Sequence, residues 1–140
     1  MIKILGYAEK IRLVLTPDWV KLLILKEDVA EFLEELKEKD FRIYILSNLS
    51  RESYEYIKKY DFWQKVDGSI FSFEEKMCKP ERKIYETLIQ KYNLIPEETI
   101  FVDDMKENID VAESLKMNGI VFQNLKQVEM EIETYLSLDR

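Results

Sequence analysis

The chain has 140 residues, of which 46% are apolar and 35% are charged, so it is long enough for one domain with a buried core. Its net charge of −7 argues against nucleic acids and anionic membranes as partners. The sequence has no histidine and a single cysteine, Cys78, which excludes histidine-dependent triads, His-ligated zinc and an internal disulfide. We expect a cytoplasmic protein whose chemistry relies on carboxylates, hydroxyls, amides and lysines.

The first half of the chain shows a helix, a strand and a second helix. Residues 27–39 carry apolar side chains at helical spacing, and Asp28 is a candidate N-cap. Residues 41–46 are mostly β-branched and aromatic, which predicts a strand. Ser50 then opens a helix that we expect to end near Tyr60.

The second half alternates between short strands and longer helices. The expected strands cover 69–73, 99–102 and 120–122. The expected helices cover 80–92, 106–117 and 125–137. Pro80 suits the first turn of its helix, and Asn118 with Gly119 is expected to end the next helix in a left-handed conformation.

This alternation is typical of βαβ units, so we expect an α/β fold with a Rossmann-like parallel sheet and helices on both faces. No repeat or linker is visible, which indicates a single domain over residues 1–140. Ligands of such sheets bind beyond the carboxyl ends of the strands. Three polar clusters fall at or just beyond those ends, namely 47–48, the loop with Lys79 and 103–104. The topology should bring them onto one rim.

Each cluster suits a phosphate or metal site, although each also has a plainer interpretation. Asp103 and Asp104 offer Mg²⁺ the oxygen ligands that it favours, or they form a solvated pair that caps the next helix. Ser47 and Asn48 suit hydrogen bonds to a phosphate near a helix N-terminus, or they are a simple helix cap. Lys79 either neutralises phosphate charge or is an ordinary surface charge.

Taken in this order, the clusters resemble the motifs of the haloacid dehalogenase (HAD) superfamily. The resemblance is carried by residues 43–48, 78–85 and 101–112, and it covers about residues 27–123. The pattern includes an Ile-Tyr pair after the lysine and Asn108, four residues past the second aspartate. The resemblance implies a HAD-like core from which the cap is largely missing.

The resemblance also implies a role for each polar residue. Ser47 would hold the phosphoryl group with Asn48 beside the substrate, and Lys79 would be a catalytic residue that steadies the nucleophile and the phosphoryl charge. Asp103 and Asp104 would hold Mg²⁺, with Asp104 as the direct ligand and Asp103 acting directly or through water. The implied activity is Mg²⁺-dependent hydrolysis of a small phosphorylated metabolite, because metal-free dehalogenases usually lack such an acidic pair.

The family's first motif, a strand that ends in Asp-x-Asp with the nucleophile first, has no match in this sequence. The nearest imitation is residues 13–18, which have Thr16 in the place of the nucleophile and Asp18 two residues later. We favour another interpretation, in which Thr16 and Pro17 begin a helix that resembles the last cap helix. The chain would then be N-terminally truncated and inactive alone.

On this interpretation, residues 1–26 are a remnant of the cap or linker and residues 27–140 are the core. The missing strand would leave a gap in the centre of the sheet. Residues 2–5 and 11–15 have a strand-like composition that is suited to filling it.

Two function classes stay open: a HAD-type phosphohydrolase, and a non-catalytic HAD-like domain that binds phosphate, metal or a protein partner. A receiver domain uses the same residue types, but its acidic pair lies on the first strand rather than at positions such as 103–104. The substrate and the oligomeric state are left open by the sequence.

Overall fold

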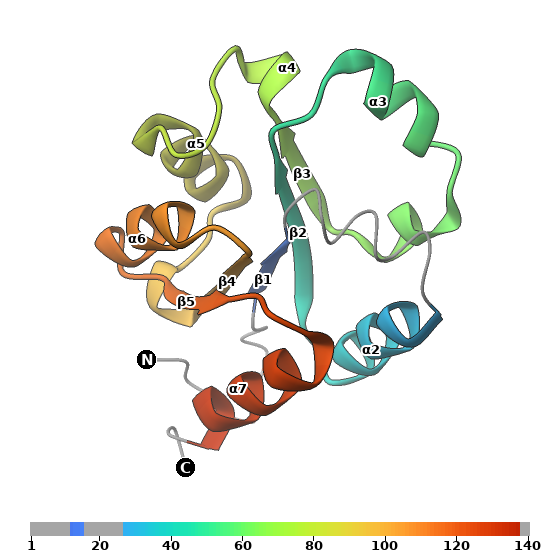
Figure 1. The fold of residues 1–140 in the computed structure, drawn as a ribbon, viewed down its shortest axis with the longest axis vertical. Coiled ribbons are helices and arrows are strands. Elements are labelled where there is room, and N and C mark those ends of the chain that lie inside the picture. The colour runs from blue at the N-terminus through green and yellow to red at the C-terminus, as the bar shows by residue number, and fades with distance from the viewer. Residues whose placement is uncertain (1–11, 16–26, 138–140) are drawn as a thin grey trace.

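Five parallel strands form the sheet of the computed structural model, which describes residues 12–15 and 27–137. In the described residues their order across the sheet is β3-β2-β1-β4-β5, and every neighbouring pair is parallel (Figure 1). This confirms the expected α/β fold. The strands are β1 (Arg12–Leu15), β2 (Arg42–Ser47), β3 (Gly68–Phe71), β4 (Thr99–Asp103) and β5 (Asn118–Val121).

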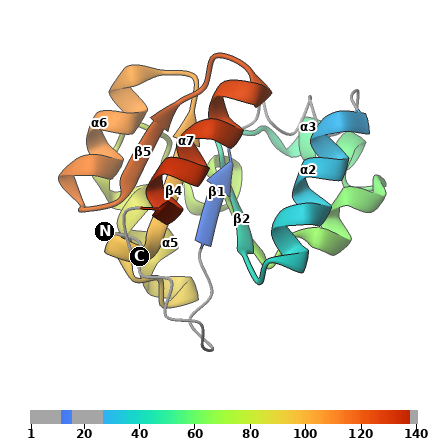
Figure 2. The same cartoon turned by 90° about the horizontal axis from the view of Figure 1, so that it is seen from below.

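Helices cover both faces of the sheet (Figure 2). One buried cluster joins the sheet to α2, α3 and α7, and a second joins it to α5 and α6. None of the helices in the described ranges is long and apolar enough to cross a membrane. The helical elements are α2 (Glu27–Glu38), α3 (Arg51–Ile57), α4 (Ser72–Glu75), α5 (Arg82–Tyr92), α6 (Lys106–Ser114), α7 (Leu125–Ser137) and the short 3₁₀ segments η1 (Asp61–Lys65) and η2 (Pro96–Glu98).

The centre of the sheet is occupied by β1, which pairs with β2 on one side and β4 on the other. The sequence left open whether the N-terminal residues would fill this position, and 12–15 do so. These four residues lie within the segment 1–26 that the sequence assigned to a cap or linker remnant. The helix expected from Thr16 lies outside the described residues.

One predicted helix cap and one predicted helix start are wrong. The helix α2 begins at Glu27, so Asp28 lies inside its first turn and is not the N-cap. The helix α5 begins at Arg82 after an extended Glu81, so Pro80 precedes the helix instead of sitting in its first turn. The predicted cap at Ser50 is confirmed, because its hydroxyl accepts a hydrogen bond from the Ser53 amide.

The ends of two predicted elements also differ. Residues 118–119 open β5 and pair with β4, and the left-handed residue after α6 is Lys116, with a φ of 73°. The amide of Met117 bonds back to the carbonyl of Ala112, so the helix is already closed before Asn118. The strand expected over 69–73 ends at Phe71, where α4 begins.

The edge strand β3 is packed closely against the end of α5. A Cβ at Gly68 would lie 2.3 Å from Cε1 of Tyr92, so only glycine lets the ring approach this closely. The Tyr92 hydroxyl donates to the carbonyl of Ser69 over 2.9 Å and accepts from its amide over 2.8 Å. The ring of Tyr92 also lies 5.0 Å from that of Tyr44 on β2.

Candidate functional site

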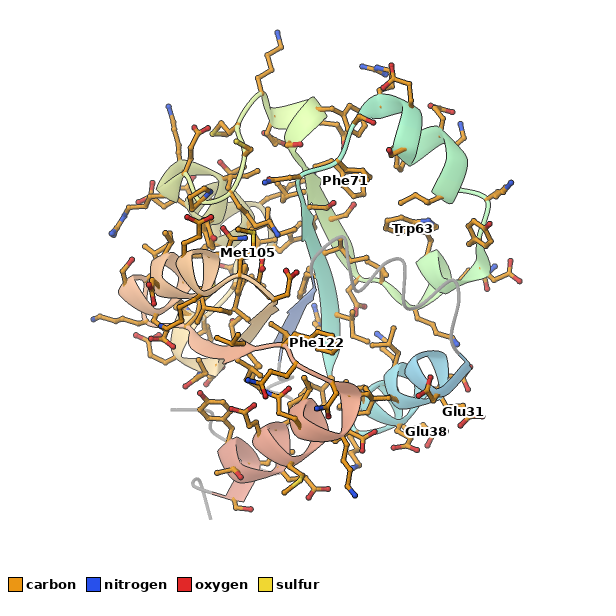
Figure 3. All side chains as sticks on the ribbon, viewed as in Figure 1. Glu31, Glu38, Trp63, Phe71, Met105 and Phe122 are labelled. Atoms are coloured by element: carbon orange, nitrogen blue, oxygen red, sulfur yellow. The ribbon has the colours of Figure 1, made fainter. Side chains whose placement is uncertain are left out.

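The predicted polar residues gather at the carboxyl edge of the sheet. Ser47 is the last residue of β2 and Asp103 is the last residue of β4, on either side of β1. Lys79 comes from the loop between α4 and α5 and reaches across to Asp103. Met105, which is labelled in Figure 3, precedes α6 at this edge. The expectation of one shared rim therefore holds for these three side chains.

Lys79 and Asp103 form a buried ion pair, with 2.9 Å between Nζ and Oδ2. Their side chains are only 3% and 1% exposed, so both charges have been removed from water. Such burial is costly unless the charges are paired and hydrogen-bonded. The carboxylate meets this condition, because it also accepts hydrogen bonds from the Met105 amide over 2.8 Å and from Asn108 Nδ2 over 3.1 Å.

Tyr85 supports this carboxylate indirectly, through Asn108. Its hydroxyl donates to the main-chain carbonyl of Asn108 over 2.9 Å, which ties α5 to the start of α6. Burial, together with the negative charge of Asp103, raises the pKa of Tyr85 above its ordinary value, so the hydroxyl stays a neutral donor. Sequence reasoning found Tyr85 and Asn108 as members of the pattern but did not assign them these contacts.

The side chain of Asn48 is bonded to the main chain of Lys79. Its Oδ1 accepts from the Lys79 amide over 2.8 Å, and its Nδ2 donates to the Lys79 carbonyl over 3.1 Å. The resemblance placed Asn48 beside the substrate. In the structure the amide joins the end of β2 to the loop that carries the lysine.

Ser47 differs from its neighbours because it is completely buried and its Oγ has no hydrogen-bond partner among the described residues. A buried hydroxyl without a partner costs on the order of 1–3 kcal/mol. Such groups in native proteins call for a physical explanation, and an unseen ligand oxygen or water is one. The position at a strand end, beside the buried lysine loop, suits a ligand that is rich in oxygen.

The acidic pair divides into a buried and an exposed residue. Asp103 is engaged as described above, whereas Asp104 is exposed at the start of the turn that leads to α6. Among the residues that the structure describes, no three His, Cys, Asp or Glu side chains come together. Two carboxylates are compatible with Mg²⁺ when phosphate and water supply its other ligands. The family resemblance implies Asp104 as the direct ligand, with Asp103 acting directly or through water.

Sequence comparison identifies related proteins. A family model for haloacid dehalogenase-like hydrolases matches residues 5–115. A sesquiterpene phosphatase from Aspergillus oryzae is 30% identical over 93 residues, which are 66% of this chain and 47% of that protein. A phosphorylated carbohydrates phosphatase from Thermotoga maritima is 29% identical over 100 residues, 69% of this chain and 46% of that protein. The chain thus spans about half the length of these relatives.

Solved structures share the fold. An uncharacterised protein from Corynebacterium glutamicum superposes with a TM-score of 0.76 and 19% identity, covering 92% of this chain and 96% of that one. A HAD family enzyme from Bacteroides thetaiotaomicron, solved with magnesium and inorganic phosphate, gives a TM-score of 0.63 and 26% identity over 67% of this chain and 50% of that one. From the family match, the relatives and the fold, we conclude that the chain belongs to the haloacid dehalogenase-like hydrolase family.

Proposed function

We propose that this chain binds the phosphoryl group of a small phosphorylated molecule, together with Mg²⁺, at the carboxyl edge of its sheet. The observation that carries the proposal is the buried, unpartnered hydroxyl of Ser47 beside the loop of Lys79. Two relatives are named as phosphatases, and a structural relative was solved with magnesium and inorganic phosphate. One cysteine and an acidic composition support a cytoplasmic location.

In this proposal each residue has a separate task. The Ser47 hydroxyl donates to a phosphoryl oxygen, and the Lys79 ammonium offsets part of the phosphoryl charge. Asp103 orients the lysine through their ion pair, and Asp104 is the direct carboxylate ligand of Mg²⁺. Mg²⁺, when bound, supplies further neutralisation of the phosphate charge.

We further propose that the chain by itself binds phosphate esters without hydrolysing them. The residue after β1 in the sequence is Thr16, where the family resemblance implies the nucleophilic aspartate. A threonine hydroxyl is a weak nucleophile without a base to activate it. The hydrolysis that the family performs would therefore need an aspartate that this sequence does not supply.

The first test measures binding. Inorganic phosphate with Mg²⁺ is titrated into the 140-residue chain in a calorimeter, and the same titration is made on Ser47→Ala and Ser53→Ala. We expect binding that weakens about tenfold in Ser47→Ala, as the loss of one hydrogen bond to a charged group predicts. Ser53→Ala, at an exposed serine in α3, should leave the affinity unchanged. Equal affinities in all three proteins would contradict the phosphate site.

The second test measures turnover of p-nitrophenyl phosphate with Mg²⁺. The natural chain should show none, whereas Thr16→Asp should gain activity, because Asp18 then completes an Asp-x-Asp pair. Thr16→Asn, which has the same size without the charge, is the matched control and should remain inactive. Turnover by the natural chain that Asp104→Asn abolishes would overturn the non-catalytic part of the proposal. Activity that returns only with an added Asp-x-Asp-bearing segment would establish truncation.

A further inference from the structure

We infer that Asn48 is a positioning residue for Lys79 and not a ligand of the substrate. The inference concerns the same site and rests on the proposed function for its link to phosphate. It revises the role that the family resemblance implied for this residue.

The contacts of the Asn48 side chain carry the inference. Two hydrogen bonds, of 2.8 and 3.1 Å, join its amide to both main-chain polar groups of Lys79, which is 31 residues away in the sequence. A planar amide that both accepts from and donates to one residue fixes the position and the orientation of that residue's main chain. The side chain thereby acts as a bridge between the end of β2 and the loop.

Lys79 is consequently held at both of its ends. Asn48 fixes the main chain of Lys79. At the other end, Nζ of Lys79 is bonded to the Asp103 carboxylate, which accepts further hydrogen bonds from Asn108 and Met105. A lysine has a long flexible stem that loses considerable rotamer freedom when it is ordered. Fixing both ends in advance places the ammonium group before any phosphate arrives, so binding need not order it.

Ser47 and Asn48, which are neighbours at the end of β2, therefore have separate roles. Ser47 is fully buried with an unpartnered hydroxyl, whereas Asn48 is exposed and its amide is engaged by the loop. Asn48 is the first residue after β2, and its side chain bonds to the loop of Lys79. The geometry gives phosphate recognition to the serine and lysine placement to the asparagine.

A double-mutant cycle tests whether Asn48 acts through the lysine. Phosphate affinity with Mg²⁺ is measured for the natural chain, Asn48→Ala, Lys79→Met and the double variant. If Asn48 acts only by placing the ammonium group, Asn48→Ala weakens binding about tenfold in the natural chain and causes no further loss beside Lys79→Met. Losses that add in the double variant would show that Asn48 touches the phosphate directly and would overturn the inference.

A second measurement needs neither phosphate nor a variant of the buried lysine. The side-chain ammonium signal of Lys79 is followed by NMR in the isotope-labelled chain, because burial and ion pairing slow its exchange with water. Asn48→Ala should shift or broaden this signal. The matched control is Asn118→Ala, which also loses side-chain bonds to main-chain carbonyls, those of Glu97 and Thr99, and it should leave the signal unchanged.

The two measurements keep the inference separate from the proposed function. If the natural chain binds no phosphate, the proposed function fails, and the ammonium signal alone then decides the role of Asn48. An ammonium signal that is the same in Asn48→Ala as in the natural chain would overturn the inference, even if phosphate binding were observed.

Discussion

Two lysine–aspartate pairs lie at opposite ends of β2, and their bonds are nearly the same length. Lys37 Nζ and Asp67 Oδ2 are 2.7 Å apart, and Lys79 Nζ and Asp103 Oδ2 are 2.9 Å apart. Each aspartate also accepts a hydrogen bond from a main-chain amide, that of Ile43 for Asp67 and that of Met105 for Asp103. The pairs differ in burial, because the first has side chains 33% and 31% exposed and the second 3% and 1%.

The distance between the two charges therefore says little about what a lysine–aspartate pair does. An exposed pair of the kind formed by Lys37 gains little over hydration and fastens α2 to the start of β2 and β3. A buried pair must be surrounded by further donors, and those donors fix where each charge lies. The buried pair lies at the carboxyl edge, where ligands of parallel sheets bind, and its carboxylate has two such donors, Met105 and Asn108.

The largest expected effect follows from removing one lysine at a time. Lys79→Met should lower the free energy of unfolding by about 3–5 kcal/mol, because it leaves the Asp103 charge buried without its partner. Lys37→Met should lower it by less than about 1 kcal/mol. Urea unfolding of both variants measures the two losses, and the loss in Lys37→Met should shrink in high salt. Losses of equal size would show that the burial of the Lys79–Asp103 pair does not matter for stability.

A smaller loss of stability is expected from replacing Asn108, whose amide supports the buried Asp103 carboxylate. Asn108→Ala removes the 3.1 Å hydrogen bond to Asp103 and should cost about 1.5–3 kcal/mol, the range for bonds to charged groups. Asn118→Ala loses bonds to neutral carbonyls and should cost about 1 kcal/mol. The two unfolding curves can be compared directly, and a greater loss in Asn118→Ala would speak against a special role for the charge.

The smallest effect is expected from Tyr85→Phe, which removes a bond to the Asn108 carbonyl and should cost about 1 kcal/mol at neutral pH. Burial raises the pKa of Tyr85, so the hydroxyl ionises at lower pH in the unfolded chain than in the folded one. Its contribution to stability is therefore complete below about pH 10 and is lost above it, by up to about 1.4 kcal/mol per pH unit.

The pH dependence of the free energy of unfolding provides the control for Tyr85→Phe. Urea unfolding at neutral pH and at several values above about pH 10 should show a shallower alkaline decline for Tyr85→Phe than for the natural chain. The difference between the two curves isolates Tyr85 from the other groups that titrate in this range. Parallel curves would mean that Tyr85 is not buried as the structure has it.

Much of the fold follows from periodicity in the sequence. The apolar spacing over 125–137 predicted α7 to the residue, and the strands β2 and β4 were each predicted to within one residue at either end. Polar residues directly after those strands then indicated the shared edge, since parallel strands end on the same side of a sheet. The position of Ser47, Lys79 and Asp103 could thus be foreseen from order alone.

The position of β1 was foreseen only as one possibility, because residues 11–15 were one of two segments with a strand-like composition suited to the central gap. A run of four apolar and basic residues gives no periodicity that distinguishes a buried central strand from part of a linker. Its place is set by pairing with β2 and β4, which are formed by residues distant in the sequence. The contacts of Asn48 could not be foreseen either, because an amide can bond to a substrate or to a main chain, and its bonds to Lys79 depend on the path of a loop distant in the sequence.

The contact between Tyr92 and β3 has a consequence for the protein's behaviour in a crowded solution. As the outermost strand on its side of the sheet, β3 has main-chain groups facing outward, and such groups can recruit a strand from another molecule. Tyr92 reaches over from α5 and occupies both outward groups of Ser69 with one hydroxyl. Gly68 leaves the room for its ring. The Tyr92 side chain thereby covers these two groups, which hinders the addition of a further strand at this point of the edge.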